Sequence, residues 1–427
     1  MTLKFNPKLV KTISNKEIQN QYKLKISKIH KSIVDKTCLG NEMLGWYDYP
    51  NDSCLSLLKN IKNLANQWKK LKINEVVIAG IGGSYTGIKA ILQFVCNSRR
   101  TKNINFTFFD SLSTNNLTYI KNLKNKNWAI IVISKSGGTL ETSINFRILR
   151  EELKKKYKNK HNERIVAITD PNHGALNKLC KKHNYKMLAI YPNIGGRFST
   201  ITPVGLFPAA LVNIDIDEII RGAKQAKNDL KSDDLNKNSA YLYAAYRHYL
   251  YKICHYDVEN VMVYEENLEY LCIQHRQLFG ETEGKNKDSL YPTYSICTTD
   301  LHSMGQLLQE GKQIFFETVI KINKPFQNIN IQKSSFENDD QLDYLSNKSL
   351  HEINYLVCEA VKKAHSNVGI NILEIILDDM SEYTFGYVYF WLSLATTMSG
   401  LLLGHNPFNQ PGVQAYKNLM FKMLGKK

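Results

Sequence analysis

The chain has 427 residues, of which 43% are hydrophobic and 22% charged, a balance typical of folded globular proteins. This length exceeds what one hydrophobic core serves, so we expect two domains, and no apolar run is long enough to span a membrane. The formal net charge of +17 comes from lysines spread along the whole chain without a nucleic-acid-binding motif, which favours a solvated basic surface over a nucleic-acid site.

The first seventy residues read as helical. Residues 1–16 are rich in lysine and lack the apolar stretch of a secretory signal, so we expect a cytoplasmic protein. Apolar residues recur at helical spacing over residues 24–34 and 55–71, on either side of a turn-rich stretch at 45–52. We find no strand-like run here and expect an N-terminal helical segment over residues 1–70.

Strands and helices then alternate. Short runs of β-branched and aromatic residues, separated by stretches long enough for crossover helices, occur at residues 75–79, 104–109, 128–133, 164–168 and 186–191. This pattern predicts an α/β domain over residues 71–194, with a parallel sheet covered by helices on both faces. Ligands of such sheets bind at the carboxyl ends of the strands.

The alternation starts again after Gly195 and Gly196. Further strands are expected at residues 260–264, 294–298, 314–320 and 371–377, with helices at 241–253 and 386–403. These elements predict a second α/β domain over residues 195–427. The polar stretch 328–347 reads as a surface excursion. Residues 385–403 are more apolar than one helix face requires, which suits either a subunit contact or a buried core helix.

A glycine-rich turn at residues 80–84 follows the strand expected at 75–79. Its glycines leave backbone N–H groups accessible, and Ser84 adds a hydroxyl, as a phosphate monoester requires. A dinucleotide fold uses the same geometry, and Asp110 partly fits the acidic residue that such a fold places after the next strand. The turn alone leaves both ligands open.

A second turn, at residues 134–139, is more specific for phosphate. Ser134, Ser136 and Thr139 surround two glycines, with Lys135 among them, at the start of a helical segment. The dipole of that helix would add to the anion site. A serine-capped helix start explains one hydroxyl but not three.

Three further stretches carry residue types that can act in catalysis, but each of them, taken singly, has an ordinary structural interpretation. Residues 280–285 read as a charged loop, the histidine in residues 299–303 as a structural residue, and Arg197 as an ion-pair partner. Their order along the chain, together with the two phosphate turns and the Asn-Pro-Phe-Asn-Gln-Pro-Gly-Val stretch at 406–413, carries more information than any of them alone.

From about residue 42 onward, the chain resembles glucose-6-phosphate isomerases of the shorter bacterial type. The resemblance rests on six ordered motifs, at residues 80–85, 133–137, 195–199, 277–285, 299–303 and 406–413. It implies two sugar-isomerase (SIS) domains, each an αβα sandwich with a mainly parallel sheet. It also implies a homodimer in which the histidine of one subunit reaches the active site of the other.

The resemblance assigns roles residue by residue. Glu281 matches the catalytic base, His302 and Lys417 the ring-opening residues, and Arg197 the arginine beside the reacting carbons. The substrate-binding positions are Gly83, Ser84, Ser134, Lys135, Ser136, Thr139, Glu141, Gly196 and Gln410. The chain departs from the usual pattern at Gly138, where a threonine is common, at Asn409 in place of aspartate, and at Gln414 in place of glutamate.

The chemistry of an aldose–ketose isomerisation asks for these residue types. A carboxylate can move a proton between adjacent carbons through a cis-enediol, histidine and lysine can exchange protons with ring oxygens, and an arginine can stabilise the developing oxyanion. We therefore predict reversible isomerisation of glucose 6-phosphate and fructose 6-phosphate. The alternatives are an isomerase of mannose or amino-sugar phosphates, and a sugar-phosphate-binding regulator without turnover.

We expect neither a metal nor a cofactor. The eight cysteines are scattered, without a C-x-x-C pair, and read as reduced core residues. The eleven histidines form no metal-ligating pair. The predicted partners are thus a small sugar phosphate and a second copy of the chain.

Overall fold

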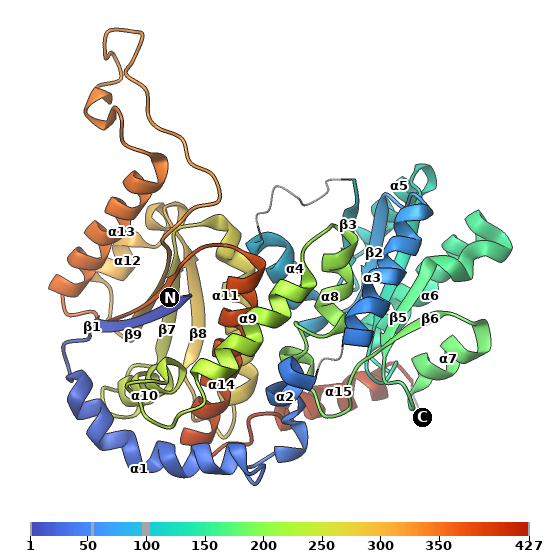
Figure 1. Ribbon diagram of the computed structural model, residues 1–427, viewed down its shortest axis with the longest axis horizontal. Coiled ribbons are helices and arrows are strands. Elements are labelled where there is room, and N and C mark those ends of the chain that lie inside the picture. The colour runs from blue at the N-terminus through green and yellow to red at the C-terminus, as the bar shows by residue number, and fades with distance from the viewer. Residues whose placement is uncertain (1, 53–54, 96–102, 426–427) are drawn as a thin grey trace.

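Two five-stranded sheets stand side by side with a layer of helices between them (Figure 1). The computed structural model describes residues 2–52, 55–95 and 103–425. The predicted α/β class with mainly parallel sheets is confirmed, since one strand pairing among the eight is antiparallel.

The first sheet has the order β3-β2-β4-β5-β6, and all its strands are parallel. Its strands are β2 (Glu75–Ala79), β3 (Asn105–Phe109), β4 (Trp128–Ile133), β5 (Ile165–Thr169) and β6 (Lys186–Ala189). Every residue of β2, β4 and β5 is buried. Strands covered on both faces read as continuous apolar runs, which is why the sequence located them within two residues at either end.

The second sheet has the order β1-β10-β9-β7-β8. Its strands are β1 (Leu3–Leu9), β7 (Val258–Val263), β8 (Tyr291–Ile296), β9 (Phe315–Ile322) and β10 (Ile372–Leu377). The expectation that the first seventy residues hold no strand is wrong, because β1 pairs antiparallel with β10. Only Leu3 of β1 is buried, so its sequence lacks the apolar alternation that predicts a strand. Pro7 also disfavours a strand in the sequence, but β1 is an edge strand, where proline is tolerated.

A second correction concerns the turn-rich stretch at 45–52, which forms helix α2 (Gly45–Asp52). Trp46 and Tyr49 are buried, and Trp46 stacks on Phe198 with ring centroids 5.3 Å apart. Burial of these aromatic rings stabilises a helix whose local sequence, with Pro50 inside it, does not favour one.

The helices before, between and after the sheets follow the predicted alternation. They are α1 (Asn15–Val34), α3 (Leu55–Lys70), α4 (Gly83–Phe94), α5 (Asn116–Asn122), α6 (Leu140–Tyr157), α7 (Ala175–His183), α8 (Pro203–Leu211), α9 (Ile216–Asp229), α10 (Ser239–Lys252), α11 (Glu269–Glu283), α12 (Gly305–Glu310), α13 (Leu350–Asn367), α14 (Glu382–Leu402) and α15 (Pro411–Met423). The short 3-10 turns that matter below are η4 (Gly196–Phe198) and η6 (Thr299–His302).

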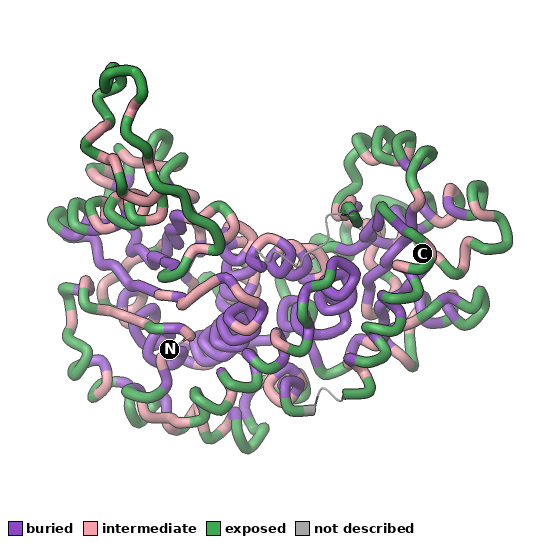
Figure 2. The backbone as a smooth tube through the Cα atoms, turned by 45° about the horizontal axis from the view of Figure 1, so that its top comes forward, coloured by how far each residue is buried: buried purple, intermediate pink, exposed green. Residues whose placement is uncertain are grey.

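Helix α14 is the centre of the core. Of its 21 residues only Tyr383 and Leu401 are not buried, so its apolar surface is covered by other elements of the same chain. Figure 2 shows the buried backbone gathered in the middle of the molecule. Of the two readings open for residues 385–403, the structure therefore selects the core helix.

The polar stretch at 328–347 is a surface excursion, as predicted. Most of it is exposed, with one short 3-10 turn, η7 (Asp343–Leu345), and a bridge between Asn330 and Ser349. It forms part of the projection that rises above α13 in Figure 1.

The described residues contain six free cysteines, five of which are buried. Cys54 and Cys96 lie outside the described residues. Within 2–52, 55–95 and 103–425, no group of three or more His, Cys, Asp or Glu side chains is placed to hold a metal ion. None of the helices described is long and apolar enough to cross a membrane.

Close contact between α9 and α14 depends on glycine at their crossing. A Cβ on Gly386 would lie 1.8 Å from the carbonyl oxygen of Ile219. We expect Gly386→Ala to lower the free energy of unfolding by about 3 kcal/mol, because neither backbone can yield without repacking the core. Chemical denaturation followed by circular dichroism measures this.

The matched control is Gly305→Ala, also in a helix, where a Cβ would meet its nearest neighbour at an ordinary 3.9 Å. Its effect should stay within about 0.5 kcal/mol. Equal stability of both variants would contradict the proposed role of the close crossing.

Candidate active site

Arg197 lies on η4, which follows the last strand of the first sheet and precedes β7 of the second, and 2% of its side chain is exposed. Its Nε donates to the Thr282 hydroxyl at 3.1 Å, one terminal nitrogen donates to Glu281 at 3.0 Å, and the other donates to the Pro407 carbonyl. Burial lowers the pKa of Arg197, and the Glu281 carboxylate opposes that shift. A buried guanidinium with partners on three sides is fixed in place.

Glu281 sits in the last turn of α11 with 30% of its side chain exposed, so one side of the carboxylate faces solvent. Its Oε2 accepts from Arg197 and from the Gln410 amide. Its Oε1 accepts from Gln277 Nε2 at 2.8 Å. The structure thus brings together three residues that stand far apart in the sequence: Arg197, Glu281 and Gln410.

The first glycine-rich turn lies directly against this cluster. A Cβ on Gly83 would lie 2.1 Å from the carbonyl oxygen of Gly196, so the start of α4 and the Arg197 turn touch through their backbones. Thr86 of α4 donates to the Gln277 side chain at 2.8 Å. Helix α4 begins without a side-chain cap. The amides of Ser84 and Tyr85 donate to the carbonyls of Ile81 and Gly82 at 3.3 and 2.8 Å, so among the described contacts the Gly83 amide, next to the half-buried Ser84, is the first-turn donor left for an anion.

The second turn leaves the same edge of the sheet. Strands β2 and β4 are neighbours, so residues 80–84 and 134–139 follow adjacent strand ends. Ser134 Oγ accepts from the Gly137 amide at 3.0 Å and lies 3.3 Å from Thr139 Oγ1, and Ser136 Oγ accepts from the Gly138 amide at 3.1 Å. These hydrogen bonds fix the backbone of the turn just before α6. Thr139, the N-cap residue of α6, makes no side-chain capping hydrogen bond.

Two other predicted substrate ligands belong to this turn. Lys135 donates to the carbonyl of Pro192 at 2.5 Å, and burial lowers its pKa while Asp170 opposes the shift. Glu141 is half-buried in the first turn of α6. Lys135 therefore lies in the turn, with its ammonium directed to the carbonyl of Pro192 in a neighbouring loop.

His302 and Lys417 make no hydrogen bond or ion pair with Arg197, Glu281 or Gln410 among the described contacts. Both are exposed, His302 on η6 after β8 and Lys417 on α15. Of the four predicted catalytic residues, the structure therefore joins Arg197 and Glu281 by direct contact.

The sequence reasoning missed Gln277, Thr282 and Lys285. Gln277 stands one helical turn before Glu281, so the i, i+4 spacing on a helix could have indicated it. Thr282 donates to the Pro407 carbonyl at 3.1 Å and accepts from Arg197. No local signal indicates Thr282, because its partners come from distant segments.

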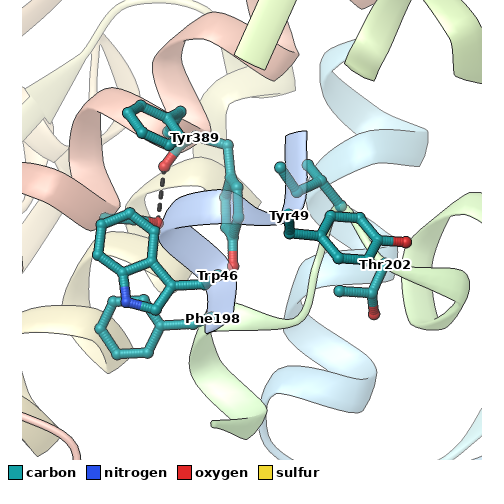
Figure 3. Close-up of a pocket in the computed structure, with 8 residues that line it drawn as sticks. Trp46, Tyr49, Phe198, Thr202 and Tyr389 are labelled. Carbon is teal, nitrogen blue, oxygen red and sulfur yellow. Dashed lines mark hydrogen bonds between the residues drawn. The ribbon is translucent and has the colours of Figure 1, made fainter. Parts of the chain in front are cut away.

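An apolar crevice is lined by Phe198, the residue after Arg197 (Figure 3). Trp46, Tyr49, Phe198, Thr202 and Tyr389 line it together with Ile201, Phe390 and Ser393, and the space between them is too narrow for a water molecule. The Tyr389 hydroxyl donates to the Arg197 carbonyl at 2.9 Å. The crevice is packing that supports the Arg197 turn.

Comparison with known proteins identifies the family. The sequence profile of the phosphoglucose isomerase family matches residues 56–426. The chain is 52% identical over 425 residues to a glucose-6-phosphate isomerase of Mycoplasmoides gallisepticum, with 99% of each chain covered. This chain belongs to the phosphoglucose isomerase family.

Solved structures show the same fold. A hypothetical protein of Thermus thermophilus superimposes with a TM-score of 0.87 at 26% identity, covering 99% of both chains. A glucose-6-phosphate isomerase of Chlamydia trachomatis superimposes with a TM-score of 0.81 at 18% identity, covering 99% of this chain and 88% of that one. The predicted α/β class with mainly parallel sheets is thus the fold of this phosphoglucose isomerase family member.

The close backbone contact at Gly83 bears on substrate binding. Gly83→Ala should raise the Michaelis constant for a sugar phosphate by about 10-fold or more, because the new methyl group displaces both the α4 turn and the Arg197 turn. Steady-state kinetics measures this.

The control for this prediction is Gly138→Thr, which restores the hydroxyl usual at that position. A Cβ on Gly138 meets its nearest neighbour, Ser136 Oγ, at an ordinary 3.5 Å. We expect an unchanged or lower Michaelis constant. A Gly138→Thr variant as impaired as Gly83→Ala would show that the effect does not arise from the backbone contact.

Proposed function

We infer that this chain interconverts D-glucose 6-phosphate and D-fructose 6-phosphate, as an aldose–ketose isomerase of glycolysis and gluconeogenesis. The observation that carries the inference is the buried Arg197, which holds Glu281 beside the anion-binding start of α4. A carboxylate and a fixed cation next to a phosphate cradle suit an open-chain sugar phosphate. Because these reactants are charged, we place the reaction in the cytoplasm.

For the proton transfer, we propose Glu281 as the base. In the open-chain aldose, its carboxylate takes the proton from C2, the electrons move towards the C1 oxygen, and a cis-enediolate forms. Transfer of the C2 hydroxyl proton to the C1 oxygen gives the cis-enediol arrangement of the ketose precursor, and return of the carbon proton from Glu281 to C1 gives the ketose. One carboxylate on one face of the substrate suffices for both steps.

Arg197 supports this step by charge. Three of its five N–H groups are taken by Thr282, Glu281 and Pro407, which leaves two for the substrate oxygens that become negative in the transition state. The charge is permanent and the side chain is already ordered, so little reorganisation is needed when the enediolate forms.

The phosphate should bind between the two turns. Gly83 and Ser84 would supply donors from α4, and Ser134, Ser136 and Thr139 from the turn before α6, with Lys135 nearby as a positive charge. Gly196, Glu141 and Gln410 would line the sugar. These contacts are the same in the ground state and the transition state, so they mainly set affinity.

For ring opening, we propose His302 and Lys417, neither of which has a hydrogen bond or ion pair to Glu281 among the described contacts. We propose a homodimer in which His302 of one subunit completes the site of the other, as the family resemblance implies. The exposed apolar side chains of α15 support a covered surface near Lys417: Tyr416 is 59% exposed, Leu419 59% and Met423 79%. No described residue of α15 is buried within its own chain.

The reaction is tested with purified protein in a coupled assay that reports glucose 6-phosphate formed from fructose 6-phosphate. Glu281→Gln should lower kcat by roughly 10³-fold while a sugar phosphate still binds, since only the proton acceptor is lost. Absence of turnover by folded wild-type protein would refute the proposed function.

Glu283→Gln is the matched control, two residues along the same helix. Glu283 is buried against Arg247 and accepts from Ser399 at 2.5 Å, so its loss should lower stability and leave proton transfer in the remaining folded protein. A dead Glu283→Gln beside an active Glu281→Gln would mean that Glu281 is not the base.

Mixed dimers test the shared site. His302→Ala and Glu281→Gln chains, each inactive alone, should regain activity when they are co-expressed, because one of the two sites then combines Glu281 of one chain with His302 of the other. About half the wild-type activity per heterodimer is expected. An inactive sample shown to contain the heterodimer would mean that both residues act within one chain.

A further inference from the structure

Lys285 contacts the backbone of the proposed base. Its Nζ donates to the carbonyl oxygen of Glu281 at 3.0 Å and to that of Thr282 at 2.5 Å. The side chains of these same two residues engage Arg197. One ammonium therefore holds the main chain of the dipeptide whose side chains order the active-site guanidinium.

These two carbonyls belong to the last turn of α11, where a helix leaves its carbonyl groups without backbone donors. The Lys285 N–H, which would continue the helix, turns instead to the carbonyl of Glu283 at 2.6 Å. The ammonium takes over the missing bonds, and its positive charge suits the negative end of the helix dipole.

We propose that Lys285 is a positioning residue for the isomerisation, holding Glu281 and Arg197 in register through the end of α11, and that it does so as an ammonium ion. The inference rests on the proposed function. Lys285 touches neither the substrate nor the carboxylate of Glu281. Loss of its proton sets an upper pH limit on turnover.

The charges around Lys285 set that limit. Burial lowers the pKa of Lys285 to about 8, Arg197 of η4 lowers it too, and Glu281 and Glu283 of α11 oppose the shift. Two nearby acids are already engaged elsewhere: Glu283 is paired with Arg247 of α10, and Asp288 with Lys252. The Asp288 carbonyl also contacts His405 Nε2.

Loss of the Lys285 proton should weaken the site. Below about pH 8, Lys285 carries its proton and its charge strengthens the bonds to both carbonyls. Above that pH, a neutral amine remains, which binds the two carbonyls more weakly. Turnover should therefore fall as pH rises through about 8, with little change in the Michaelis constant.

The experiment compares kcat and the Michaelis constant of full-length wild type, Lys285→Arg and Lys285→Gln between pH 6.5 and 9.5. We expect Lys285→Gln to lower kcat about 10-fold at pH 7, with the Michaelis constant within about 2-fold, and to lack the inflection near pH 8. Lys285→Arg should recover most of the activity and keep it through pH 9, because a guanidinium stays charged. Lys287→Gln, at an exposed neighbour, is the control for loss of a lysine charge.

Two results would overturn this inference and leave the proposed function intact: a Lys285→Gln variant that keeps its kcat, or an alkaline inflection that survives in Lys285→Arg. If Lys285→Gln does not fold, the pH profile of Lys285→Arg decides alone. Loss of turnover in the folded wild type overturns the proposed function itself, and amine labelling of Lys285 across pH then reports whether the ammonium titrates near pH 8.

Discussion

The burial of one cation organises this protein. Arg197 comes from the chain that leaves the first sheet, and its three partners come from α11 and the segment before α15. A guanidinium removed from water must be surrounded by acceptors, so the two halves of the molecule can only meet with Glu281, Thr282 and the Pro407 carbonyl in place. The same constraint that satisfies Arg197 presents the carboxylate to the site.

Helix α11 is held at its end from several sides. Arg247, fully buried on α10, binds Glu283 of α11 and Glu259 of β7. Lys285 holds two carbonyls of the last turn, and Gln277 links the helix to Thr86 of α4. Glu281 is therefore the partly exposed group at the end of a helix whose other polar contacts are fixed, which is what a proton-transfer group of defined geometry requires.

The first glycine-rich turn lies against the Arg197 turn because their backbones touch. Gly83 rests on the carbonyl of Gly196, a contact that any side chain at that position would prevent. The proposed phosphate site of the first sheet and the Arg197–Glu281 pair are in this way held next to each other. The apolar stack of Trp46 on Phe198 closes the rear of the same turn. The residues that position the site thus extend to helix α2, which holds no predicted substrate ligand.

Local composition was enough to predict the α/β class and the strands buried on both faces, and the order of motifs was enough to indicate the family. The two phosphate turns and the catalytic residues stay predictions. These predictions rest on patterns of the sequence itself, which do not depend on folding. Other features depend on tertiary contacts. Strand β1 exists because the edge of β10 offers it a partner, and α2 exists because Trp46 and Tyr49 find a core. Three further features arise from contacts that form only in the folded chain: the bond of Thr282 to Arg197, the close crossing of α14 over α9 at Gly386, and the bonds of Lys285 to the end of α11. No local sequence pattern predicts these contacts.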